Sequence, residues 1–241
     1  TTGNPKGVMH TVGTITNSTH NSLKFISIKE HPKYFSFLPL AHIAERGITE
    51  MGSMFRGGSM TFAESLETFA SNLEATQPDV FFAVPRIWAK FQEKILMGLP
   101  QKKLSKLLRL PIVGGIVKKK IKKKLGLSNA AYIVSGAAPI SVSLLEWFNK
   151  LGITILQGYG MTEDCIVSHF NLPDANKFGT VGKPVYGATA KLSAEGEICI
   201  KNNCLMKGYY KNPEATAEMF DEQGYLKTGD IGEYDHDGYL T

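Results

Sequence analysis

Cysteine is scarce in this sequence, and its three occurrences, Cys165, Cys199 and Cys204, are odd in number and match no metal-binding spacing. A disulfide framework is therefore excluded, and free thiols favour a reducing compartment over secretion. Long apolar runs are also missing, since segments such as 110–117 fall well short of the roughly 18–20 residues that span a bilayer. With 43% hydrophobic and 20% charged residues, the composition excludes intrinsic disorder. These absences predict a globular, cytoplasmic protein.

Acidic residues are absent from Lys94 to Leu145, a segment that holds eleven of the 27 lysines and arginines. The other 16 basic residues face 22 acidic ones, so the positive net charge of +5 belongs to this one segment. Two interpretations stay open: a solvated helical face, or a basic amphipathic helix on the anionic inner face of a membrane. Nucleic acid is disfavoured as a partner because the segment has no interleaved aromatic residues. Apolar residues at nearly helical spacing are Leu104, Leu107, Leu108, Ile112, Ile116 and Ile121.

Short apolar segments alternate with helical patterns through most of the chain, which predicts an α/β fold with a mostly parallel sheet layered with helices. Such sheets bind ligands at the carboxyl ends of their strands. After about residue 179, alternating segments and the turn signal Asp237-Gly238 predict antiparallel strands instead. We therefore expect an α/β core over residues 1–178 and a small β-rich subdomain over 179–241. In the core we expect strands at 34–38, 59–62, 79–84, 131–134 and 153–156, and helices at 41–55, after Ser65, at 86–97 and at 141–150.

Three short motifs carry residue types that suit nucleotide chemistry. TTGNPKG (residues 1–7) combines hydroxyls, glycine and a lysine, as in a phosphate-wrapping loop, although it is not a Walker P-loop. GYGMTE (158–163) follows an expected strand, where a tyrosine ring could face a base while threonine and glutamate hold a phosphate and Mg²⁺. KTGD (227–230) ends in an aspartate that could accept hydrogen bonds from ribose hydroxyls. Taken alone, each motif is more typical of an ordinary polar turn.

Together and in this order, TTGNPKG, SGAAP (135–139), GYGMTE and KTGD resemble the adenylate-forming superfamily of acyl-CoA synthetases, firefly-type luciferases and peptide-synthetase adenylation domains. SFLPLAHIAER (36–46) and VPRIWAKF (84–91) are similar to the long-chain fatty acid–CoA ligase branch. The resemblance spans the whole chain. It implies that a fatty acid attacks the α-phosphorus of ATP with Mg²⁺ present, releasing pyrophosphate, and that the thiol of CoA then displaces AMP.

The resemblance also implies a role for individual residues. Thr162 would contact phosphate, Glu163 would hold Mg²⁺ and Asp230 would bind the ribose. His42 would lie beside the acyl site, where a cavity wall and a packed core residue are both open interpretations. The residues implied for the phosphate loop are Thr1, Thr2, Gly3 and Lys6, and those for the adenine pocket are Gly136, Ala137, Ala138 and, against the base, Tyr159.

The sequence departs from this family at both ends. It begins inside the phosphate loop, and it stops where relatives continue into a hinge and a mobile C-terminal lid that carries a lysine. We therefore expect a central piece of a ligase, truncated at both ends and lacking the lid domain, that turns over little alone. Two alternatives remain: a fatty acyl-AMP ligase or another carboxylate-activating relative, and a non-catalytic module that binds nucleotide or a lipid surface through the Lys94 to Leu145 segment.

Overall fold

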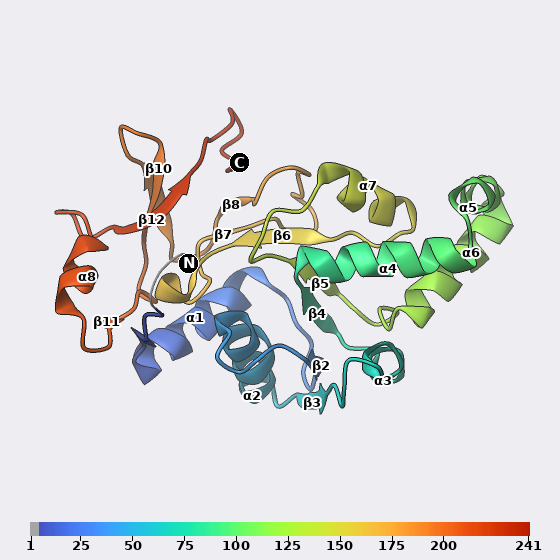
Figure 1. The fold of residues 1–241 in the computed structure, drawn as a ribbon, viewed down its shortest axis with the longest axis horizontal. Coiled ribbons are helices and arrows are strands. Elements are labelled where there is room, and N and C mark those ends of the chain that lie inside the picture. The colour runs from blue at the N-terminus through green and yellow to red at the C-terminus, as the bar shows by residue number, and fades with distance from the viewer. Residues whose placement is uncertain (1–4) are drawn as a thin grey trace.

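Residues 5–241 are described by the computed structural model, and their largest element is a seven-stranded sheet (Figure 1). The strand order is β3-β2-β4-β5-β6-β7-β8; the first five strands are parallel, and β7 and β8 are antiparallel to their neighbours. The predicted mostly parallel α/β fold is therefore confirmed. The strands are β2 (Lys33–Ser36), β3 (Ser59–Phe62), β4 (Val80–Ala83), β5 (Tyr132–Ser135), β6 (Leu156–Tyr159), β7 (His169–Phe170) and β8 (Lys183–Pro184).

Helices cover both faces of this sheet, because its parallel strands are apolar on both sides. On one face a large core forms around Trp88, Phe81 and Phe148, and it includes side chains of α3, α4 and α7. On the other face a smaller cluster around Tyr34 and Val134 packs beside α1, α2 and the π-helix η1 (Figure 1). The helices are α1 (Val12–Phe25), η1 (Glu45–Met51), α2 (Gly52–Arg56), α3 (Phe69–Thr76), α4 (Pro85–Gly98), α5 (Gln101–Leu108), α6 (Pro111–Lys124) and α7 (Val142–Lys150).

The C-terminal part of the chain is β-rich and antiparallel. Its three-stranded sheet contains β9 (Thr189–Leu192), β10 (Glu197–Lys201) and β12 (Leu226–Ile231). A short sheet pairs β1 (Val8–Met9) with β11 (Gly208–Tyr209), so the start of the described chain lies against this region; α8 (Pro213–Glu218) follows β11. The division at residue 179 stays a proposal, since β1 pairs across it and β8 extends the large sheet beyond it.

Local signals located most elements correctly, and three needed correction. The helix expected after Ser65 begins only at Phe69, because Ser65 and Thr68 close a turn through mutual hydrogen bonds. The helix expected over 41–55 begins later, after a turn in which His42 N–H donates to the Pro39 carbonyl, and its first half is π-helical. The strand expected over 153–156 is β6, shifted so that its pairing with β5 starts at Leu156.

Among residues 5–241, no helix combines the length and the apolar character needed to cross a bilayer.

Candidate functional site

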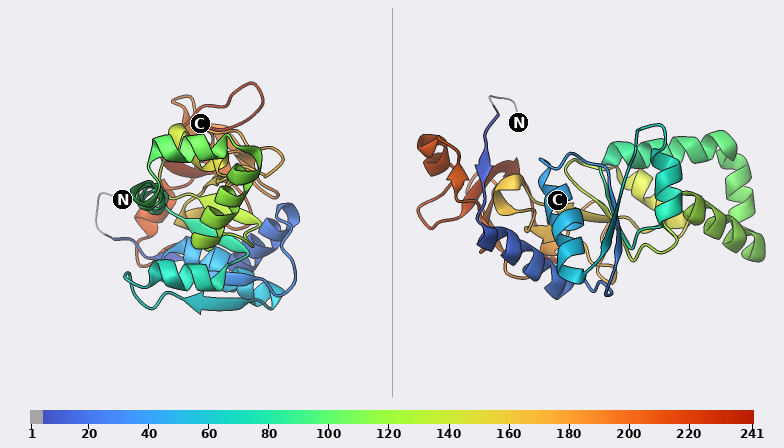
Figure 2. Two further views of the ribbon diagram at one scale, coloured as in Figure 1. Left: turned by 90° about the vertical axis from the view of Figure 1, so that its right-hand side faces the viewer. Right: turned by 90° about the horizontal axis from the view of Figure 1, so that it is seen from below.

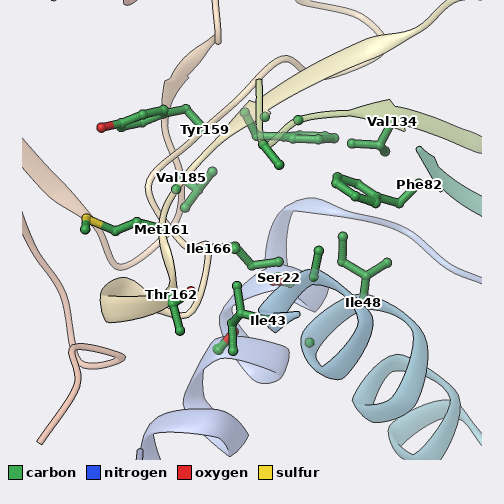
Figure 3. A pocket seen from close by; sticks show the side chains of 18 of the residues that line it. Ser22, Ile43, Ile48, Phe82, Val134, Tyr159, Met161, Thr162, Ile166 and Val185 are labelled. Carbon is green, nitrogen blue, oxygen red and sulfur yellow. The ribbon is translucent and has the colours of Figure 1, made fainter. Parts of the chain in front are cut away.

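A cavity of about 710 Å³ runs along the sheet face that α1 and η1 cover (Figure 3). At one end lie Tyr159, the last residue of β6, and Met161 and Thr162 just beyond it. At the other end lie Phe82 and Val134, on the strands themselves. Its volume falls within the range of about 300–1,000 Å³ that is typical of small-molecule sites. The cavity therefore has a polar mouth at the strand ends and an apolar arm along the sheet.

The π-helix η1 forms part of the wall of the apolar arm. Gly47 and Ile48 of η1 line the cavity, and Gly52 follows at the start of α2. A Cβ on Gly52 would meet the Tyr34 hydroxyl at 2.7 Å, so glycine is needed for this close approach. The apolar and aromatic residues that line the arm are Phe25, Ile26, Ile28, Tyr34, Ile48, Val80, Phe82, Tyr132, Val134 and Phe170.

In the polar mouth, Glu163 is held by a tyrosine from a distant part of the sequence. The Tyr209 hydroxyl donates to Glu163 Oε1 at 2.6 Å, and burial together with this hydrogen bond raises the pKa of Tyr209. Lys6 Nζ lies 4.5 Å from the centroid of the Tyr209 ring, a cation–π distance. This arrangement depends on the pairing of β1 with β11, which places the chain around Lys6 beside Tyr209. The other carboxylate oxygen, Glu163 Oε2, has no hydrogen-bond partner within residues 5–241 and is available to bind a cation.

Asp230 and Tyr159 also line the mouth and are hydrogen-bonded to each other. The Tyr159 hydroxyl donates to Asp230 Oδ2 at 2.6 Å, and burial and this bond raise the pKa of Tyr159, so it remains a neutral donor at physiological pH. The backbone N–H of Asp230 donates to Thr228 Oγ1 at 3.2 Å, which fixes the end of β12. Asp230 itself is exposed and lines the cavity, so its carboxylate is accessible to a ligand.

The segment from Gly160 to Val167 is folded back on itself by strained backbone. Cys165 and Ile166 have φ values of 54° and 59°, a region that a β-branched residue rarely adopts. Ile166 N–H donates to the Met161 carbonyl at 3.0 Å, and His10 Nε2 lies 2.7 Å from the Thr162 carbonyl oxygen. Backbone strain of this kind clusters at functional sites. In this chain the strained turn follows η2 (Thr162–Asp164), whose residues Thr162 and Glu163 line the cavity.

Asp164 is the fully buried member of this segment. Its Oδ1 accepts the Met161 N–H at 2.9 Å, whereas Oδ2 has no partner within the described residues. Burial, with a smaller contribution from the neighbouring charge of Glu163, raises the pKa of Asp164 to about 7. The carboxyl is therefore largely neutral in the folded state at moderately acidic pH.

A pH-dependent stability follows from Asp164. The folded protein keeps this proton up to about pH 7, whereas the unfolded chain loses it near the usual pKa of 3.8. The contribution of Asp164 to the free energy of unfolding is therefore full below pH 3.8 and is lost as the pH rises to about 7. His169, whose pKa is lowered to about 4 by burial, has the opposite slope. We therefore compare Asp164→Asn with wild type, because the His169 contribution cancels. Urea unfolding at pH 5 and pH 8 should show that wild type loses about 2–3 kcal/mol more than the variant; parallel curves would contradict the shift.

The structure brings most of the predicted site residues to one cavity. Lys6, His42, Gly136 and Ala137 line it, as do Tyr159, Thr162, Glu163 and Asp230. His42 is half-buried at the wall, and its Nδ1 accepts the Ala44 N–H at 3.2 Å. Ala138 is exposed and is not among the lining residues. Thr1, Thr2 and Gly3 lie outside the described residues.

Sequence reasoning missed Tyr209 and the whole apolar arm. Tyr209 lies in the GYY stretch at 208–210, which carries no chemical signal on its own. Its relevance becomes visible only in the structure, through the hydrogen bond to Glu163. The arm is formed by core-type residues from several separate elements, which apolar patterning alone assigns to the interior.

This chain is similar to known proteins over its whole length. The AMP-binding enzyme family matches residues 1–210. Long-chain-fatty-acid–CoA ligase 5 of Rattus norvegicus is 34% identical over 277 aligned residues, which cover 100% of this chain and 40% of the relative. Long-chain-fatty-acid–CoA ligase ACSBG2 of Xenopus laevis is 32% identical over 278 residues, with 100% and 38% covered. The chain thus spans less than half the length of these relatives.

Solved structures also match this chain over nearly its whole length. The o-succinylbenzoate CoA synthetase of Bacillus subtilis, in complex with its acyl-adenylate intermediate, matches with a TM-score of 0.77 and 26% identity over 99% of this chain and 46% of that one. The N-terminal domain of FACL13 from Mycobacterium tuberculosis matches with a TM-score of 0.75 and 25% identity over 99% of this chain and 57% of that one. The fold is therefore that of the N-terminal domains of acyl-CoA synthetases.

Proposed function

Because the chain belongs to the AMP-binding enzyme family, we propose that it forms the acyl-adenylate site of a long-chain fatty acid–CoA ligase. One observation carries this proposal: a polar mouth containing Lys6, Glu163 and Asp230 continues directly into an apolar arm. An acyl-adenylate has the same two parts, a charged nucleotide and an apolar chain. The ligase would use ATP and a fatty acid in a first step and CoA in a second.

The residues of the mouth suit the nucleotide end. The Asp230 carboxylate would accept hydrogen bonds from the ribose hydroxyls, and the Tyr159 ring would lie against the base, beside Gly136 and Ala137. Thr162 and Lys6 would contact phosphate, with Lys6 supplying positive charge. The protein's part is then to position the reactants and to stabilise charge at phosphorus, with no covalent protein intermediate.

Glu163 fits the requirements of a magnesium site. Its available carboxylate oxygen is the kind of ligand that Mg²⁺ takes, and one or two carboxylates suffice when substrate phosphates and waters complete the shell. Within residues 5–241, no cluster of three or more His, Cys, Asp or Glu side chains forms a metal site, so substrate phosphates would have to contribute. Bound Mg²⁺ would neutralise phosphate charge.

In the reaction, a carboxylate oxygen of the fatty acid would form a bond to the α-phosphorus while the bond to pyrophosphate breaks. The thiolate sulfur of CoA would then attack the acyl carbon, and AMP would leave with the bonding electron pair. In both steps the apolar arm would hold the chain so that the carboxyl carbon lies at the mouth. His42, which lines the cavity, would contact the substrate near this carbon.

We expect the chain to bind a non-hydrolysable palmitoyl-adenylate analogue at least about a hundredfold more tightly than the acetyl-adenylate analogue, because burial of each methylene contributes about 0.8 kcal/mol. Calorimetric titration measures both affinities. Ile48→Asp, which places a charge in the arm, should reduce this preference and leave AMP affinity unchanged. Equal affinities of wild type for the two analogues would refute the acyl assignment. No binding of AMP by wild type would refute the nucleotide assignment.

Slow turnover of this chain by itself stays a prediction. An assay of pyrophosphate release from ATP and a fatty acid checks it.

A further inference from the structure

The basic segment noted in the sequence folds into a helical hairpin that takes no part in the cavity. The α5–α6 hairpin, residues 101–124, lies at the end of the molecule opposite the three-stranded sheet (Figures 1 and 2). Its two ends are tied to the body, since Trp147 Nε1 donates to Gln101 Oε1 at 2.8 Å and Gln77 Nε2 donates to the Lys123 carbonyl at 2.8 Å. The hairpin is therefore a fixed part of the fold rather than a mobile tail.

The two helices pack closely, and only their inner sides join the core. A Cβ on Gly114 would meet the Leu108 carbonyl oxygen at 2.8 Å, so glycine lets α6 begin directly against the end of α5. Leu104 is buried in the main core, and Val117 and Ile121 pack against it. These contacts account for the apolar residues on the inner side of the hairpin and for none of those on its outer side.

Large apolar side chains on the outer side are exposed to solvent. Ile112 is 81% exposed, Ile116 is 62% exposed and Leu110 is 50% exposed. Ile112 and Ile116 are four residues apart and lie on one face of α6, away from the face that carries Val117 and Ile121. They are therefore not the edge of the core. Exposed apolar clusters of this kind mark interaction sites.

The same face of α6 becomes basic in its second half. Lys119 and Lys123 continue the row of Ile112 and Ile116 at helical spacing, with Lys120 beside them, and all three lysines are exposed. The hairpin contains no acidic residue. Among the described residues its basic side chains form one ion pair, from Lys124 to Glu74 at 3.1 Å. Apolar and basic residues are thus separated along the axis of α6, not around it.

We propose that the α5–α6 hairpin docks on the surface of an anionic phospholipid membrane. The apolar start of α6 would enter the boundary between headgroups and acyl chains, to a depth of about 5–10 Å. Lysines further along the helix would then lie at the level of the lipid phosphates, where each contributes to binding. Separation along the axis suits this tilted insertion. Duplex nucleic acid would pair with the lysines but leaves the exposed isoleucines without a partner.

The proposal is independent of the reaction, because binding to vesicles needs neither ATP nor fatty acid. Sedimentation of the full chain with vesicles of phosphatidylcholine and phosphatidylglycerol in equal parts gives the partition coefficient. We expect the triple variant Lys119→Gln, Lys120→Gln, Lys123→Gln to lower it about a hundredfold at low salt, and Ile112→Ser with Ile116→Ser to lower it about tenfold. The matched control, Lys24→Gln, Lys33→Gln, Lys207→Gln, removes the same charge from exposed sites elsewhere and should change it little.

Each result decides the proposal. Binding to anionic vesicles that both hairpin variants weaken, with the control unchanged, supports it. It is overturned if wild type does not bind these vesicles or binds pure phosphatidylcholine equally well. An equal loss of binding in the control variant would mean that net charge alone matters. An unchanged partition coefficient for the serine variant would rule out insertion of Ile112 and Ile116. Binding to duplex DNA that outcompetes the vesicles would assign the hairpin to nucleic acid. Because all the substituted side chains are exposed, a thermal unfolding scan should show that every variant is folded.

Discussion

Replacing Asp230 by alanine is expected to lower the affinity for a palmitoyl-adenylate analogue by at least about a hundredfold, because two charge-assisted hydrogen bonds to ribose would be lost at about 1.5–3 kcal/mol each. The carboxylate is accessible at the mouth of the cavity. Its position is set by β12 and by the hydrogen bond from Tyr159 at 2.6 Å. Calorimetric titration of wild type and variant under identical conditions measures the difference.

A second variant, at Tyr159, separates the effect of losing the Asp230 carboxylate from the effect of losing the hydroxyl bonded to it. Tyr159→Phe keeps the aromatic ring but removes the hydroxyl that now occupies Asp230 Oδ2. We expect its affinity to stay within about threefold of wild type, because the ring that would face the base is kept and the ribose hydroxyls no longer compete with the Tyr159 hydroxyl for Asp230 Oδ2. Glu195→Ala, at an exposed turn of the antiparallel sheet, serves as a control for removal of a surface carboxylate. Wild-type affinity in Asp230→Ala would show that this residue does not bind the ribose.

The sequence predicted what local chemistry determines. Pro85 opens α4 at a position where its missing N–H costs nothing, and Ser141 caps α7 by accepting the Leu144 N–H at 3.4 Å. The parallel order of the strands follows from the alternation of strands and helices. GYGMTE was expected at the end of a strand, and Tyr159 indeed ends β6. These features depend on residues that are close together in the chain.

The features that escaped prediction depend on contacts between distant segments. Tyr209 pairs with Val8 of β1, about 200 residues away, and donates to Glu163, 46 residues away, and no local pattern encodes either contact. The positive φ of Ile166 contradicts the preference of a β-branched residue, and it persists because the surrounding segment is held by hydrogen bonds. The helix expected after Ser65 begins late for a local reason, since serine favours turns as well as helix starts.

Gly160→Ala is expected to lower the free energy of unfolding by about 2–3 kcal/mol, a cost typical of overpacking. A Cβ at Gly160 would lie 2.5 Å from Ile166 Cα and 2.7 Å from its carbonyl carbon. Both are backbone atoms, so the obstacle cannot rotate away. Ile166 would have to move, and its hydrogen bond to the Met161 carbonyl would move with it. Urea unfolding followed by tryptophan fluorescence measures the change in stability.

Gly160→Ala should also weaken ligand binding, because Thr162 and Glu163 lie between Gly160 and Ile166 in the chain and line the cavity. We expect the affinity for the palmitoyl-adenylate analogue to fall at least about tenfold, the effect of one misplaced charge-assisted hydrogen bond. Gly115→Ala is the matched control: its Cβ meets nothing within 4 Å on α6, so alanine should stabilise the helix by about 0.5–1 kcal/mol and leave ligand affinity unchanged. If Gly160→Ala were as stable as wild type, the close approach of Ile166 would not exist. If it lost stability but kept full affinity, the folded-back segment would support the sheet without positioning Thr162 and Glu163 for the nucleotide.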